Sequence, residues 1–199
     1  MIGIIDFGGG NIHSVKKAFD HLGFRSKVIS SPSEFKGIDR MVFPGVGSYG
    51  HTIQTLSSLK MLHPIRDWIE ENRPFLGICL GLQLLLQTSE ESPGYKGLGF
   101  FKGNCLRFTQ KKVPQIGWNN ISFKTEHPMF SDIQSRSYFY FVHSFYIQPD
   151  ETEVVLAQTD YGIKYTSSAG RGNIIGVQFH PEKSGPLGLK LMKNWVTKC

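Results

Sequence analysis

The chain lacks long apolar runs and has only three cysteines. None of its hydrophobic stretches approaches the roughly 20 residues that a membrane-spanning helix needs. The N-terminus has no basic segment followed by a long apolar stretch, so we expect no secretory leader. Cys79, Cys105 and Cys199 are an odd number without metal-ligand spacing. These features predict a soluble cytoplasmic protein with reduced thiols and no metal site.

Blocks of one charge are also missing. Lysine and arginine exceed aspartate and glutamate by 22 to 16, which gives a formal net charge of +6. The basic residues are scattered, and the densest pairs are Lys16-Lys17 and Lys111-Lys112. No basic helix or aromatic ladder accompanies them, so a nucleic-acid partner is not expected. A solvated surface explains this charge.

No linker, repeat or low-complexity stretch divides the 199 residues, and 40% of them are hydrophobic. We therefore expect one domain over residues 1–199. In the first half, strand and helix signals alternate at Ile2–Ile5, Ile12–Leu22, Lys27–Ile29, Met41–Phe43, Tyr49–Asn72 with a break at Pro64, Phe75–Ile78 and Leu80–Leu86. Such alternation is typical of a parallel sheet covered by helices on both faces.

After residue 95 the pattern changes to a run of strand signals. They lie at Phe100–Phe108, Gly117–Phe123, Tyr138–Ile147, Val154–Thr159, Ile163–Ala169 and Ile174–Phe179. An amphipathic helix is predicted over Gly185–Val196. The whole pattern predicts an α/β fold, with a central, mostly parallel sheet flanked by helices and an antiparallel extension of that sheet.

A nucleophile is predicted at Cys79, where an apolar strand meets a helix. Gly77 and Gly81 leave room for a tight turn, and a helix N-terminus favours a thiolate. The N–H of Leu80, the next residue, would then point at a developing oxyanion. A buried cysteine that acts as a small hydrophobe is the alternative for this segment taken alone.

A base and its orienting carboxylate are predicted at His180 and Glu182. His180 directly follows the strand that ends at Phe179, at the edge where open α/β sheets bind ligands. Glu182 is close enough in sequence to reach the imidazole ring. Combined with the cysteine turn, this pattern favours a Cys-His-Glu triad for acyl transfer. A metal site is not indicated, because no other ligand cluster accompanies His180.

Two glycine-rich loops have other possible uses. Gly8-Gly9-Gly10 follows the first strand but lacks the lysine and hydroxyl residue of a triphosphate loop. Gly45–Gly50 matches the dinucleotide fingerprint, yet it follows the third strand and no acidic strand end stands about 20 residues on. Amides of this second loop suit an oxyanion hole opposite Leu80 better.

Three segments together resemble the triad-type (class I) glutamine amidotransferases: Pro44–Gly47, Gly77–Leu85 and Gly176–Ser184. Further segments resemble the glutaminase subunits of imidazole glycerol phosphate synthase, namely Gly10–Ile12, Gly117–Asn119 and Tyr140–Ser144. The resemblance spans nearly the whole chain. It implies a class I amidotransferase fold, hydrolysis of glutamine to glutamate and ammonia, and no cofactor. It also implies a (β/α)8-barrel cyclase subunit that uses the ammonia in histidine biosynthesis.

The resemblance implies roles for individual residues as well. Cys79 would form a γ-glutamyl thioester, His180 would protonate the departing ammonia and then activate water, and Glu182 would orient the ring. The oxyanion positions match Gly47 and Leu80. The positions that hold glutamine match Gln83, Glu91, His143, Ser144 and Phe145. The positions at or near the partner interface match Asn11, Trp118, Tyr140 and Lys183. Without the resemblance, three of these would be interpreted as a helix-surface residue, a core or rim aromatic and a solvated charge: Gln83, Trp118 and Lys183.

One position departs from the resemblance. Gln115 stands before Ile116–Asn119, where the family usually has a histidine. Because this position lies near the expected partner-facing region, a second assignment stays open: a paralogous subunit that supplies ammonia to a synthase of bacterial surface sugars. A third is a non-catalytic scaffold that only binds a barrel partner, although the complete Cys79, His180 and Glu182 set weighs against it.

Overall fold

The computed structural model describes all 199 residues. Its strands are β1 Ile2–Ile5, β2 Ser26–Ile29, β3 Arg40–Phe43, β4 Phe75–Ile78, β5 Thr88–Ser89, β6 Gly103–Arg107, β7 Gln115–Asn120, β8 Ser122–Phe123, β9 Tyr138–His143, β10 Phe145–Pro149, β11 Val155–Asp160, β12 Lys164–Arg171 and β13 Ile174–Val177. Its α-helices are α1 Ile12–His21, α2 Tyr49–Ser58, α3 Leu62–Glu70, α4 Leu80–Gln83 and α5 Gly185–Lys198. Short 3-10 helices include η2 Pro128–Phe130 and η4 Pro181–Lys183.

The main sheet has the order β2-β1-β3-β4-β13-β12-β10-β6-β5, with β11 and β8 paired beside β12. The first five strands in this order, β2, β1, β3, β4 and β13, are parallel. The next three, β12, β10 and β6, continue the sheet in antiparallel fashion. Every residue of β1, β4 and β13 is buried, as expected for strands covered on both faces. The predicted α/β class, with its antiparallel extension, is confirmed.

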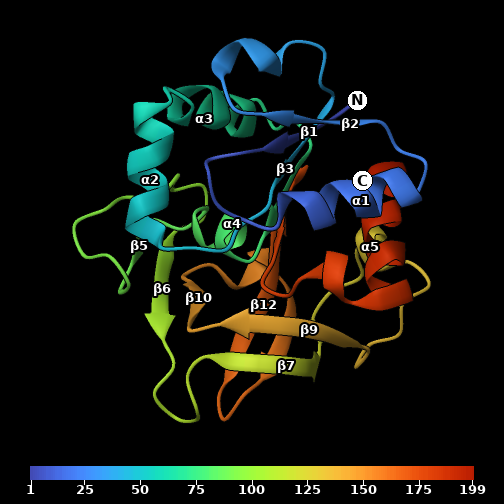
Figure 1. Cartoon of the computed structure of the whole chain (residues 1–199). Coiled ribbons are helices and arrows are strands. Elements are labelled where there is room, and N and C mark those ends of the chain that lie inside the picture. Colours follow the sequence, from blue (N-terminus) through green and yellow to red (C-terminus); the bar gives the residue numbers. More distant parts are fainter.

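Two hydrophobic cores of 25 buried residues each are packed in this fold. One includes Phe19 of α1 and Trp195 of α5, and the other includes Leu56 of α2 and Trp68 of α3. Figure 1 shows these two helix pairs in separate parts of the molecule, with the β7–β9 ribbon beyond the main sheet. Each core combines residues from both halves of the chain. None of the helices is both long and apolar enough to cross a membrane.

The edge of the sheet explains where the candidate residues meet. β4 and β13 are parallel neighbours, with Ile78 beside Val177. Both strands therefore end at the same carboxyl edge, which is where ligands bind in folds of this class. Cys79 follows β4, and His180 follows β13 after a short loop. The backbone N–H of Cys79 donates to the Val177 carbonyl at 2.7 Å, which ties the two strand ends together.

Two of the predicted elements are divided differently. The helical stretch from Tyr49 to Asn72 breaks at Lys60, whose φ is 57°, rather than at Pro64. Pro64 lies in the first turn of α3, where its missing N–H would have no intrahelical partner anyway. The predicted strand Tyr138–Ile147 is two strands, because β9 pairs with β7 whereas β10 pairs with β6.

The helix predicted over Leu80–Leu86 ends at Gln83. The carbonyl groups of Leu84 and Leu85 accept hydrogen bonds from Leu98 and Phe101, in the segment that leads to β6. These bonds replace the ones that a longer helix would make. Leucine-rich sequence therefore indicates burial here and not helix length.

Candidate active site

Cys79 lies in a sharp turn between β4 and α4, with a φ of 54° and a ψ of −104°. Residues other than glycine rarely adopt these backbone angles, so the surrounding structure must hold the residue there. A Cβ on Gly81 would stand 2.2 Å from the Phe43 carbonyl oxygen, and one on Gly77 would stand 2.6 Å from Gly81 backbone atoms. Both glycines are therefore required by close packing, as the sequence predicted.

The electrostatic support for a thiolate differs from the prediction. α4 has only four residues, so a helix macrodipole contributes little at Cys79. Individual donors are available instead. Leu80 is the first residue of α4, so its N–H has no partner inside the helix. The side-chain amide of Gln178 donates to Cys79 Sγ at 3.5 Å.

His180 and Glu182 form a buried pair. Nδ1 of His180 lies 2.8 Å from Oε1 of Glu182, and each side chain is 1% exposed. The backbone of this loop is fixed, because the His180 N–H donates to the Tyr140 carbonyl at 2.8 Å. Burial lowers the pKa of His180, but the negative charge of Cys79 and the bond to Glu182 outweigh it and raise the pKa to about 10. The imidazole is therefore protonated at neutral pH when Cys79 is ionised.

A cavity of about 270 Å³ lies beside Cys79, a size suited to a single amino acid. It is lined by Val46, Gly47, Cys79, Leu80, Gln83, Glu91, Pro114, Val142, His143, Ser144 and Phe145. All seven residues predicted to form the oxyanion site or to hold glutamine are in this set. His180 and Glu182 do not line the cavity, since both are buried in the loop after β13.

Two glutamine side chains connect the cavity wall to the sulfur. Gln83 is 5% exposed, so it is not a helix-surface residue. Its Nε2 donates to the Phe145 carbonyl at 2.9 Å and to Gln178 Oε1 at 3.2 Å. The sequence interpretation missed Gln178 as a site residue. The sequence does contain one sign of its role, because Gln178 is a polar residue inside the apolar run Ile174–Phe179, and a buried amide needs hydrogen-bond partners.

His143 is a neutral, buried ring. Its Nδ1 lies 2.8 Å from the Phe145 carbonyl oxygen, so Nδ1 carries the proton and donates. Its Nε2 lies 3.3 Å from the Tyr165 hydroxyl. Burial lowers the pKa of His143 to about 4, with a further lowering by the charge of His180. The residue thus brings no charge to the cavity and holds the Phe145 carbonyl in place.

Gln115 belongs to the same network. The Tyr165 hydroxyl donates to Gln115 Oε1 at 3.0 Å, and Gln115 is 2% exposed. Its β7 neighbours Ile116 and Trp118 are 62% and 56% exposed. The Gln115 side chain therefore does not lie on the exposed face of β7. Side chains alternate across a strand, and that of Gln115 points inward.

The loop before α2 forms the other wall of the cavity. Gly47 has a φ of +136°, and nothing lies within 4 Å of the place a Cβ would occupy. Its N–H donates no backbone hydrogen bond, which leaves it available to a ligand. Glu91 supports the end of this loop, because its Oε2 accepts the N–H of Tyr49 at 2.7 Å.

A family model described as glutamine amidotransferase class-I matches residues 3–199. The chain belongs to this family. Curated relatives named imidazole glycerol phosphate synthase subunit HisH include that of Chlorobaculum tepidum, 45% identical over 98% of this chain and 99% of the relative. The one from Caldanaerobacter subterraneus subsp. tengcongensis is 42% identical over the full length of both. A chain in the structure of PurLQS from Thermotoga maritima, 18% identical, shares the fold with a TM-score of 0.79, over 98% of this chain and 96% of that one.

The residues that the resemblance places at the amidotransferase's partner interface lie on neighbouring elements. Trp118 and Tyr140 are a cross-strand pair of β7 and β9, with ring centroids 6.2 Å apart. Lys183 is exposed in η4. Asn11 precedes α1, and its amide lies 3.4 Å from Glu182 Oε1. Asn11 therefore contacts the candidate triad, which a surface role alone would not require.

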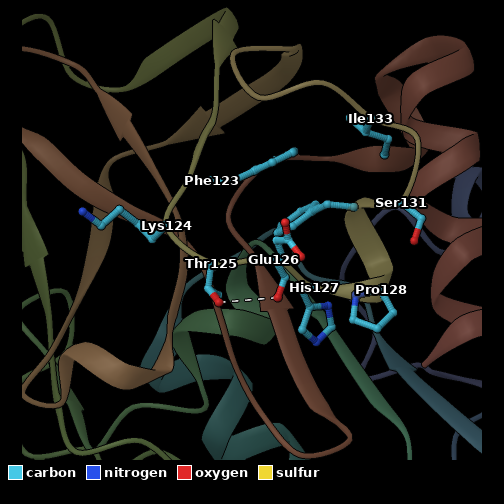
Figure 2. A pocket seen from close by; sticks show the side chains of 9 residues that line it. Phe123, Lys124, Thr125, Glu126, His127, Pro128, Ser131 and Ile133 are labelled. Carbon is cyan, nitrogen blue, oxygen red and sulfur yellow. Dashed lines mark hydrogen bonds between the residues drawn. The ribbon is translucent and has the colours of Figure 1, made fainter.

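A larger cavity of this amidotransferase lies elsewhere. It has a volume of about 640 Å³ and is lined by one stretch of chain, 123–133 (Figure 2). Its only histidine, His127, has a pKa lowered by burial, and its Nδ1 accepts the N–H of Met129. The cavity contains no cysteine and no hydrogen-bonded histidine–carboxylate pair. Cavity size alone therefore does not locate the chemistry in this fold.

Proposed function

We propose that residues 1–199 form one glutaminase domain that hydrolyses glutamine to glutamate and ammonia with the triad Cys79, His180 and Glu182. The observation that supports it is the buried His180–Glu182 pair, 2.8 Å apart, which follows β13, the strand beside the one that leads into the strained Cys79 turn. Membership of the class I glutamine amidotransferases indicates that the acyl donor is glutamine. The amino-acid-sized cavity at Cys79 fits that donor.

The reaction proceeds in two steps, acylation of Cys79 and hydrolysis of the resulting thioester. The Cys79 thiolate attacks the side-chain carbonyl carbon of glutamine, the C–N bond breaks, and the nitrogen takes the proton of His180 and leaves as ammonia. Neutral His180 then takes a proton from water, whose oxygen attacks the thioester. The C–S bond breaks, Cys79 leaves as the thiolate, and glutamate is released. Glu182 holds the ring through Nδ1 and leaves Nε2 for both transfers.

Two backbone N–H groups are proposed to stabilise the oxyanion, those of Gly47 and Leu80. Both residues line the cavity, and neither N–H is taken up by a helix or strand. Glu91 carries the charge needed to bind the α-ammonium group of glutamine. The remaining proposed binding residues shape the cavity around the substrate: Gln83, His143, Ser144 and Phe145.

The ammonia is proposed to pass to a (β/α)8-barrel cyclase subunit in histidine biosynthesis. Relatives at 41–45% identity over almost their full length are named as subunits of imidazole glycerol phosphate synthase. The ribbon face that carries Ile116, Trp118 and Tyr138 is apolar, and these residues are 56–62% exposed, as in a docking surface. Tyr140 lies on this face, and we place Asn11 and Lys183 at its margin.

The alternative of a surface-sugar synthase rested on Gln115 at that surface. Because the Gln115 side chain is buried, it gives no reason for a different partner. The biosynthetic relatives and the need for a reduced nucleophile support a cytoplasmic location.

The test is Cys79→Ala in the complex with the cyclase. Glutamine-dependent synthesis is expected to be abolished, whereas synthesis from added ammonium salt persists because the barrel still receives its co-substrate. Both rates are measured on the same preparation. Undiminished glutamine hydrolysis by the variant would refute the assignment of the nucleophile.

A further inference from the structure

Gln178 is a fully buried polar side chain whose position the proposed mechanism does not explain. It is 0% exposed and lies between Val177 and Phe179, which are also buried. Its backbone N–H donates to the Ser167 carbonyl at 2.9 Å, so the strand holds the residue in place. Its side chain lies between Gln83 and Cys79. Burying an amide is costly unless its polar atoms find partners.

The orientation of the Gln178 amide follows from its neighbours. Gln83 approaches the Phe145 carbonyl at 2.9 Å, and only its nitrogen can donate there. The same nitrogen faces Gln178 at 3.2 Å, so the Gln178 atom on that side must be the acceptor oxygen. The nitrogen of Gln178 is therefore turned to the other side. There it lies 3.5 Å from Cys79 Sγ.

We propose that Gln178 is a catalytic residue that donates a hydrogen bond to the sulfur of Cys79 and stabilises its thiolate. A donor to the ionised form of a group favours that form. Because α4 has only four residues, its dipole stabilises the thiolate little, and a fixed local donor contributes more. When Cys79 is a thiol, its S–H can donate a hydrogen bond to the Val142 carbonyl, 3.9 Å from Sγ.

This inference rests on the proposed role of Cys79 as the nucleophile, and the experiment separates the two. The full-length chain is alkylated with iodoacetamide across pH 5–10, and the rate at the Cys79 peptide is followed by mass spectrometry. Cys105 is buried and its raised pKa makes it a poor competitor. A wild-type Cys79 that reacts no faster than an ordinary thiol would refute the proposed function itself.

The decisive variant is Gln178→Met, which keeps the length of the side chain and removes the donor. The pH at which alkylation is half-maximal is expected to rise by about one unit. In the complex, kcat for glutamine is expected to fall while KM changes little, because the sulfur and not the pocket is affected. An unchanged half-point in a folded Gln178→Met chain would overturn the proposal.

Two further variants separate the donor from packing. Asn194→Leu removes a buried amide whose partners are the Met129 and Ser131 carbonyls, and it should leave the half-point unchanged. Gln83→Leu breaks the bonds to Phe145 and Gln178 but keeps the donor, so it should raise KM and move the half-point less than Gln178→Met. Equal shifts in all three variants would overturn the proposal.

A measurement on the wild-type chain covers the case in which Gln178→Met does not fold. With selectively labelled glutamine, the assigned side-chain amide resonances of Gln178 should titrate with the same midpoint as alkylation of Cys79. Those of Gln158, which is only partly buried on β11, should not follow that midpoint. Gln178 resonances that stay constant through the titration would overturn the proposal.

Discussion

The two sides of the candidate site differ in how the fold holds them. Cys79 is 6% exposed and His180 is 1% exposed, and both follow neighbouring buried strands. By contrast, Val46 in the loop before α2 is 39% exposed, and Trp118 of the β7–β9 ribbon is 56% exposed. Core packing therefore holds the proposed nucleophile and its base in place, whereas the loop before α2 and the ribbon face solvent. Substitutions on the buried side should therefore reduce the stability or the catalysis of the chain itself. Substitutions on the exposed side should reduce turnover or binding of the cyclase.

The largest effect is expected from Gly81→Ala. The added Cβ would stand 2.2 Å from the Phe43 carbonyl oxygen, and a backbone atom cannot yield as a flexible side chain can. We expect a loss of about 3 kcal/mol in the free energy of unfolding, measured with urea. Gly47→Ala is the control from the exposed side, because its Cβ meets nothing within 4 Å and should cost less despite its positive φ. Equal losses of stability in the two variants would contradict this difference between the buried and the exposed side.

Glu182→Gln should act on the chemistry more than on the fold. The amide oxygen of the new side chain can still accept a hydrogen bond from Nδ1 of His180, but the negative charge that helps to raise the pKa of His180 is gone. We expect a loss of about 100-fold in kcat. Loss of the His180 proton limits the rate at high pH. The alkaline limb of the kcat/KM profile should therefore move to lower pH. An unmoved limb would show that Glu182 does not set this titration.

Trp118→Ala tests the exposed side. The loss of a large, exposed ring should weaken binding of the cyclase by about 2 kcal/mol, measured by calorimetry. The melting temperature of the isolated chain should change little, since the ring is 56% exposed. Leu59→Ala is a matched control, because Leu59 is 38% exposed and directly follows α2, a helix that Figure 1 shows apart from the ribbon. Equal weakening by both would place the docking surface elsewhere.

The smallest effect is expected from Gln115→Met. The Tyr165 hydroxyl loses one acceptor but keeps His143 Nε2 at 3.3 Å, so the cost in unfolding free energy should be about 1 kcal/mol. The affinity for the cyclase should stay as in the wild type, because the Gln115 side chain does not reach the surface. A loss of affinity larger than the loss of stability would contradict the buried position of Gln115.

Sequence patterns predicted the parallel strands and the order of the elements, because short β-branched runs between glycines leave few other structures. They failed where tertiary contacts decide. The leucines after Gln83 bond to the Leu98–Phe101 segment, and one predicted strand is divided between β9 and β10. The seven residues around Cys79 were found through the family motifs. Gln178 was not, because its role depends on the orientation of its amide and not on spacing.

The covalent intermediate offers the most direct test of the proposed mechanism. The complex is mixed with glutamine, quenched in acid within one turnover and digested, and the peptides are analysed by mass spectrometry. A glutamyl adduct is expected on the peptide that contains Cys79, and it should accumulate in any variant that slows hydrolysis of the thioester. An adduct on Cys105 or Cys199, or steady turnover with no adduct at all, would contradict it.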